Sequence, residues 1–99
     1  MNNSNTITAE QQTTYTQTEL LSLINQYNQT PRKLIKQNLR KILTTHNLEP
    51  KQLIEIGYSS PTVYAWLAPK SKNMPMLEQI LNISNAFDFS IEEFLKEIE

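Results

Sequence analysis

The side chains that could perform chemistry in this chain are few, and none stands in a catalytic pattern. Cysteine is absent, which excludes disulfides, thiolate metal sites and cysteine nucleophiles. His46 is the sole histidine and has no cysteine or second histidine to complete a metal site. Ser59 and Ser60 lack a neighbouring base and a glycine elbow, so helix capping is favoured over a nucleophilic role. The sequence therefore predicts neither an enzyme nor a cofactor.

Charge is segregated along the chain, although the net charge is only −1 at pH 7. Residues 30–72 carry eight Lys or Arg against two acids, a net charge of +6. Residues 73–99 carry one base against six acids, a net charge of −5. In the acidic part, Glu92 and Glu93 are interpreted as a solvated helix face rather than as paired catalytic carboxylates. On charge alone, a solvated helix face is slightly favoured for the basic part, and a phosphate-bearing partner is the alternative.

Length and hydropathy limit the protein to one small domain. A chain of 99 residues has no room for a second independent core. No apolar run is long enough to cross a membrane, and the first residues lack the basic and apolar segments of a signal peptide. Residues 1–18, rich in Asn, Gln, Thr and Ser, are predicted to form a disordered polar tail before a single helical domain at 19–99. We therefore expect a cytoplasmic protein with no membrane partner.

Apolar side chains recur at helical spacing, and the alternating pattern of a strand is absent from the sequence. A first helix is expected after a capping box formed by Thr16 and Glu19. Thr30 and Pro31 fit the N-cap and first position of a second helix, which would run to about Thr45 with its basic side chains outward. The predicted fold class is all-α, a compact bundle of five or six short helices.

The most specific local signals surround the sole glycine of the chain. Pro50 fits the first turn of a short helix, which Gly57 must end. A glycine just after a helix indicates a backbone position with positive φ. Ser59 or Ser60 then caps a second helix, with Trp66 on its buried side. Two short helices joined by a tight turn are typical of a helix-turn-helix.

Residues 39–95 resemble the phage-repressor/Cro-like family, also called the xenobiotic-response-element family, with its helix-turn-helix at about 50–68. GYSSPTVYAWL at 57–67 is similar to the family's turn and recognition helix, and MPMLEQILNISNAFDFSIEEFL at 74–95 is similar to its last two helices. The resemblance implies a lambda-repressor-like fold. It further implies a sequence-specific transcriptional regulator, a repressor, that binds double-stranded DNA as a homodimer.

The resemblance also implies roles for individual residues on both sides of the turn at Gly57. The residues that would contact base edges in the major groove are Ser60, Pro61, Tyr64 and Ala65. The residues that would contact phosphates are Lys51, Ser59, Thr62, Lys70 and Lys72. Helical periodicity independently places the first set opposite the expected buried side of its helix.

A second hypothesis belongs to a different class of protein. The groove-facing set contains no Arg, Asn or Gln, the side chains that read bases with paired hydrogen bonds. Its composition favours a protein-interaction module with the same fold, antitoxin-like or a phage-encoded inhibitor, which binds a protein partner. Lysines at positions 51, 70 and 72 favour DNA instead.

A homodimer is expected because one helix-turn-helix offers little contact area on DNA. Two apolar helix faces are candidates for the contact between subunits. The predicted dimer contact is the face of the last helix, formed by Ile91, Phe94, Leu95 and Ile98. The alternative is the face of the first helix, formed by Leu20, Leu23, Ile24 and Tyr27.

Overall fold

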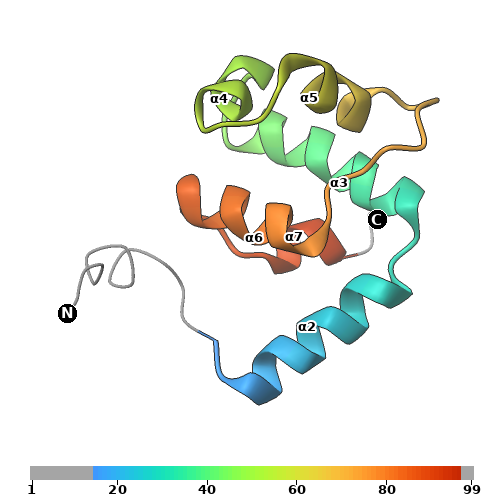
Figure 1. Cartoon of the computed structure of the whole chain (residues 1–99), viewed down its shortest axis with the longest axis vertical. Helices are drawn as coiled ribbons and strands as arrows, with labels where there is room; N and C mark the ends of the chain where they lie inside the picture. Colours follow the sequence, from blue (N-terminus) through green and yellow to red (C-terminus); the bar gives the residue numbers. More distant parts are fainter. Residues whose placement is uncertain (1–14, 97–99) are drawn as a thin grey trace.

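The computed structural model describes residues 15–96, which form six helices and no strand. The helices are α2 (Gln17–Gln29), α3 (Arg32–Thr45), α4 (Pro50–Glu55), α5 (Ser60–Leu67), α6 (Leu77–Ala86) and α7 (Glu92–Leu95). Helices α3 to α7 pack together, and α2 extends away from one end of this body (Figure 1). The prediction of an all-α chain with five or six helices is confirmed for the described residues.

Helices α2 and α4 are among those that begin with capping boxes built from neighbouring residues. At α2, the Thr16 side chain accepts from the Glu19 amide at 3.1 Å, and the Glu19 carboxylate accepts from the Thr16 amide at 2.8 Å. This is the capping box predicted from the sequence. At α4, Glu49 is the N-cap, Pro50 follows in the first turn, and Gln52 Oε1 accepts from the Glu49 amide at 2.8 Å. Each capping box joins residues three apart in the chain, so both helix N-termini can be recognised from the sequence.

The boundaries near the N-terminus differ from the predicted ones. Helix α2 begins at Gln17, inside the predicted tail, so the boundary at residue 18 moves toward the N-terminus. The rest of that tail, residues 1–14, lies outside the described residues. Thr30 is not the N-cap of α3. Its hydroxyl donates to the Gln26 carbonyl of α2 at 2.6 Å, and Pro31 is the N-cap of α3 instead.

Three helices end on a residue with positive φ just after the C-cap. These residues are Asn47, Gly57 and Asp88, with φ of 58°, 123° and 59°. At the end of α4 the Gly57 amide donates to Ile54 at 3.0 Å and the Tyr58 amide donates to Leu53 at 3.4 Å. This pair of bonds is the Schellman motif, which satisfies the last carbonyls of a helix. The predicted positive φ at Gly57 is confirmed.

The core is assembled around α3, which supplies more buried apolar side chains than any other described helix. Its members are Leu23, Ile35, Leu39, Ile42, Leu43, Leu53, Val63, Trp66, Ile80, Ile83, Ile91 and Phe94. Helix α2 reaches this core through Leu23, while the Tyr27 hydroxyl donates to the Pro75 carbonyl at 3.0 Å. Burial raises the pKa of Tyr27 above its usual value of 10.0. Trp66 lies in the core, as predicted.

The predicted dimer contact on the last helix is wrong for its two largest described members. Ile91 is 2% exposed and Phe94 is fully buried, both within their own chain. Leu95 is half-buried against the same core, and Ile98 lies outside the described residues. Helix α7 packs on α3. This contact buries the apolar face of the last helix within its own chain, so that face is not available to a second subunit.

Glu93 is also placed differently from the solvated position predicted for it. Its Oε1 atom lies 3.0 Å from Nε2 of His46, and both side chains are partly buried. The His46 ring stacks on Phe89 with ring centroids 4.8 Å apart. His46 is the C-cap of α3, so this contact joins the end of α3 to the start of α7.

Candidate functional site

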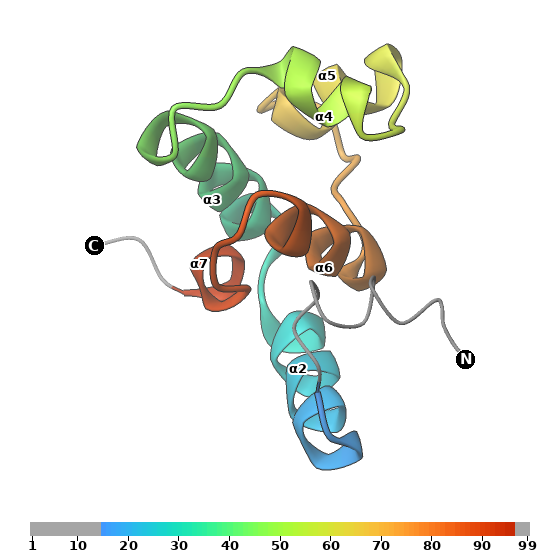
Figure 2. The ribbon, with the colours of Figure 1, turned by 90° about the vertical axis from the view of Figure 1, so that its left-hand side faces the viewer.

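Helices α4 and α5 lie side by side across the turn at Gly57 (Figure 2). Leu53 of α4 and Val63 of α5 are both fully buried where the two helices meet. The Tyr58 ring packs edge-on against Trp66, with centroids 5.1 Å apart, and its hydroxyl oxygen accepts from Asn82 at 3.3 Å. These contacts fix which side of α5 faces the core.

The opposite side of α5 is the one predicted to contact bases. Ser60 and Pro61 are exposed, and the Tyr64 side chain is 54% exposed. Ala65 is only half-exposed. The structure therefore brings three of the four predicted residues to one open helix face, and it partly covers the fourth.

Two of the predicted phosphate contacts bond to each other at the start of α5. Ser59 is the N-cap: its Oγ accepts from the Thr62 amide at 3.3 Å and donates to Thr62 Oγ1 at 2.8 Å. The hydroxyl proton of Ser59 is thus used inside the protein, whereas Thr62 keeps its own proton for a ligand. Lys51 is exposed and lies 3.5 Å from Glu49, an ion pair that contributes little in water.

Lys36 has a role that the sequence interpretation missed. The basic side chains of α3 were predicted to point outward, which is wrong for Lys36, since it is 3% exposed. Its Nζ atom donates to the Ala65 carbonyl at 2.8 Å and to the Asn73 carbonyl at 2.6 Å. The spacing of Lys36 could have indicated its burial. It precedes the core residues Leu39 and Leu43 by three and seven positions, so it shares their face of the helix. Lys36 therefore ties the end of α5 to the loop before α6.

The charge of Lys36 is not compensated by a carboxylate. Burial lowers the pKa of Lys36 from its usual value of 10.5, and the nearby charges of Arg40 and Arg32 lower it further. Arg40 also reaches α5, where its Nη1 donates to the Leu67 carbonyl at 3.2 Å. Two cations thus bind carbonyls at the negative end of the α5 dipole, where positive charge is favourable.

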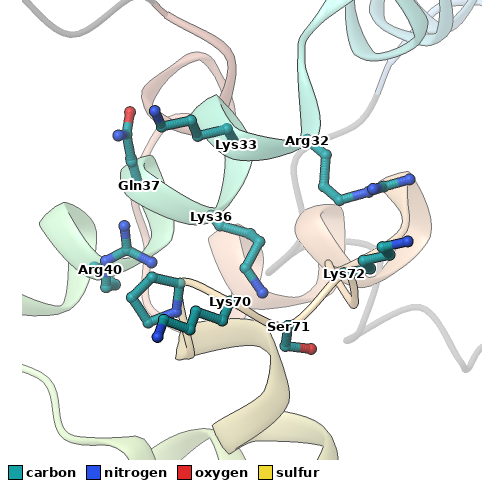
Figure 3. Close-up of a pocket in the computed structure, with 9 residues that line it drawn as sticks. Arg32, Lys33, Lys36, Gln37, Arg40, Lys70, Ser71 and Lys72 are labelled. Atoms are coloured by element: carbon teal, nitrogen blue, oxygen red, sulfur yellow. The ribbon is translucent and has the colours of Figure 1, made fainter.

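A hollow of about 360 Å³ opens beside Lys36, and we call it the basic pocket. Its lining is Arg32, Lys33, Lys36, Gln37, Arg40, Pro69, Lys70, Ser71 and Lys72. The Lys36 side chain points between Arg32 and Lys72 on one side and Arg40 and Lys70 on the other (Figure 3). Lys70 and Lys72, two predicted phosphate contacts, are therefore gathered with basic residues of α3 that the prediction did not include. Within residues 15–96 no carboxylate forms an ion pair with any lining cation.

Comparison of the chain with protein-family models, curated proteins and solved structures found no match. Among the helices of residues 15–96, none is long and apolar enough to cross a membrane. In the same part of the chain, no group of His, Cys, Asp or Glu side chains is placed to hold a metal ion. What the protein binds must be inferred from its own surfaces.

Proposed function

We propose that the protein is a DNA-binding transcriptional regulator, a repressor, in which α4 and α5 form a helix-turn-helix. The observation that carries the proposal is the open face of α5, which stands next to a concentration of basic residues without acidic partners. In this arrangement α5 enters the major groove, and α4 holds it in place across the turn at Gly57.

The open face of α5 can form single contacts with base edges. The hydroxyls of Ser60 and Tyr64 donate or accept one hydrogen bond each, and the Pro61 ring can pack on a thymine methyl group. Ala65, half-covered in the protein, contributes less. Because no side chain here binds a base through two hydrogen bonds, part of the specificity must come from DNA shape and from the spacing of half-sites.

The distribution of charge supports one orientation on the duplex. The described acidic residues of the C-terminal region, Glu78, Asp88, Glu92 and Glu93, lie on or beside α6 and α7, which Figure 2 shows below α4 and α5. Thr62, Lys70 and Lys72 lie toward the α5 side and would bind the phosphates next to the groove. A duplex in this position meets the basic surface and avoids the acidic one.

The homodimer is proposed to form through α2. The first helix is the alternative that the sequence left open, and α7 buries its own apolar face within the chain. The predicted face of the first helix is wrong for Leu23, which is buried in the core, and Tyr27 is half-buried. Three apolar side chains of α2 remain accessible: Leu20, Leu21 and Ile24, with exposed fractions of 37%, 61% and 43%. Two copies of this face, related by a two-fold axis, would cover each other and set two α5 helices at a fixed distance.

The first test is the salt dependence of binding to DNA from upstream of the protein's own gene. We expect the logarithm of the association constant to fall linearly with the logarithm of salt concentration, with a slope of about −0.9 per phosphate neutralised. Replacing Lys70 and Lys72 together by Ala should weaken binding to all sequences alike and reduce that slope by about 2. The matched control replaces Lys41 and Lys96, two exposed lysines outside the basic pocket. Absence of binding at low salt, or no preference over random duplex, would overturn the proposal.

Tyr64→Ala tests the assignment of the groove-facing side. We expect a change in sequence preference of about 0.5–1.5 kcal/mol at one base position, the net contribution of one hydrogen bond, with little change in affinity for random DNA. Tyr64→Phe removes only the hydroxyl and keeps the ring, so it should change the preference in the same way if the hydroxyl makes the base contact. Selection of binding sites from a random duplex pool measures both. An unchanged preference in Tyr64→Ala would show that another surface reads the bases.

The second candidate function is a protein-interaction module, and the chemistry of α5 is the observation that favours it. The exposed residues Ser60, Pro61 and Tyr64 offer a small, uncharged surface that suits a protein partner as well as a base edge. The salt titration separates the two candidates, because a module of this kind gives no saturable DNA binding at low salt.

A further inference from the structure

The basic pocket gathers more positive charge than the fold itself uses. Arg40 and Lys36 hold carbonyls of α5, but the other lining cations form no hydrogen bond or ion pair within the described residues. Like charges held together in a hollow repel one another, and they destabilise the empty protein. Burial lowers the pKa of Lys36, and the charges of Arg40 and Arg32 lower it further. A multiply charged anion in the hollow would remove this repulsion.

Several hydrogen-bond donors surround the hollow. A lysine ammonium has three N–H groups, and Lys36 uses two of them on protein carbonyls. The third is not taken by a protein acceptor within the described residues, and Lys36, although buried, lines the hollow. Arg32 and Lys72 lie on one side of Lys36, and Arg40 and Lys70 lie on the other, with the charged ends of Arg32, Lys70 and Lys72 pointing away from the Lys36 ammonium (Figure 3). Guanidinium and ammonium groups bind phosphoryl oxygens well.

We propose that the basic pocket binds a small polyphosphate, an anion with two or more linked phosphoryl groups. Its volume of about 360 Å³ lies in the range of small-molecule sites, about 300–1,000 Å³. A linked chain of phosphoryl groups offers more negative charge and more acceptor oxygens to the lining cations than one phosphoryl group does. The site does not depend on DNA binding.

Polyphosphate binding has a regulatory consequence that rests on the proposed function. Lys70 and Lys72 belong both to the basic pocket and to the surface proposed to meet DNA phosphates. An occupied pocket would neutralise them and lower the affinity for DNA. Lys36 would transmit the same event to α5, because it bonds the Ala65 carbonyl and the loop after α5.

The test is calorimetric titration of the full chain with tripolyphosphate at low ionic strength, beside orthophosphate and sulfate at matched ionic strength. We expect one saturable site for tripolyphosphate, about tenfold or more tighter than for orthophosphate. Arg32→Gln changes an exposed pocket residue and should weaken tripolyphosphate binding about tenfold, the loss of one charge-assisted contact. Lys41→Gln removes the same charge from α3 outside the pocket and should have little effect.

A second readout separates a built site from general attraction between charges. Tripolyphosphate should raise the pKa of Lys36, followed by NMR of its side chain, because a bound anion favours the charged ammonium. Lack of saturable binding, equal losses in Arg32→Gln and Lys41→Gln, or an unchanged Lys36 titration would each overturn the proposal.

A parallel titration with duplex DNA distinguishes the source of the phosphoryl groups. If random duplex DNA binds and tripolyphosphate does not, and Arg32→Gln weakens the duplex alone, the hollow is part of a DNA surface and the proposal fails. If tripolyphosphate binds and no duplex does, the polyphosphate site stands and the proposed regulator function fails. If duplex DNA and tripolyphosphate compete for the protein, the result supports both the polyphosphate site and the regulator function.

Discussion

Asn38→Asp is expected to destabilise the protein by about 3 kcal/mol or more, the cost of leaving a buried charge without a partner. Asn38 lies on α3 and is fully buried. Its Nδ2 donates to the carbonyls of Phe94 and Lys96, both at 2.7 Å. The substitution replaces this donor by a carboxylate oxygen that faces two carbonyl oxygens.

The expected effect depends on pH in a defined direction. Burial disfavours the charged form of the introduced carboxyl group, so its pKa in the folded state lies above the unfolded value of about 3.9. The folded variant is therefore least destabilised below that value, and it loses stability as the pH rises through the folded-state pKa. At low pH the protonated carboxyl group can donate one hydrogen bond to either carbonyl, which adds to the recovery.

Urea denaturation followed by circular dichroism measures the loss. Asn38→Leu, of similar size, removes both hydrogen bonds without adding charge and should cost less, about 1–3 kcal/mol. Asn28→Asp makes the same chemical change at an exposed position of α2 and should stay within about 0.5 kcal/mol of the original chain. If Asn38→Asp lost no more stability than Asn28→Asp, the hydrogen bonds from Asn38 to the Phe94 and Lys96 carbonyls would not join α3 to α7.

Leu21→Glu is expected to convert the proposed homodimer into a monomer and to weaken operator binding by about 10²–10⁴-fold, the typical gain from joining two binding modules. Leu21 is the most exposed apolar side chain of α2. A carboxylate there would have to be buried against its symmetry mate, where like charges repel. The fold of each subunit should persist, because the side chain is open to solvent in the single chain.

Sedimentation velocity and the DNA-binding isotherm measure the two effects of Leu21→Glu. Gln26→Glu adds the same charge at an exposed position on another face of α2 and should leave the dimer intact. A protein that is monomeric before substitution, or a Leu21→Glu variant that remains dimeric, would remove α2 as the contact. Unchanged DNA binding by a monomeric Leu21→Glu variant would show that dimerisation does not supply the affinity.

Local features of the fold could be predicted because their causes lie within a few residues. The capping box of Thr16 and Glu19, the Pro50 helix start and the positive φ of Gly57 each involve neighbours along the chain. The exposed side of α5 followed from periodicity once Trp66 was taken as core. The capping position of Thr30 was the local failure, because its hydroxyl bonds backward to α2 instead of forward.

The sequence by itself determined that the chain is helical, where its helices turn, and how its charge divides along its length. Tertiary structure decided the rest, because it depends on contacts between residues far apart in the chain. Lys36 meets Ala65 and Asn73, and Asn38 meets Phe94, at distances in sequence where periodicity carries no information. Those contacts bury Lys36 and Asn38 of α3, the helix whose basic side chains were expected to face solvent. They also build the basic pocket and leave α2, rather than α7, with an apolar face still open to a partner.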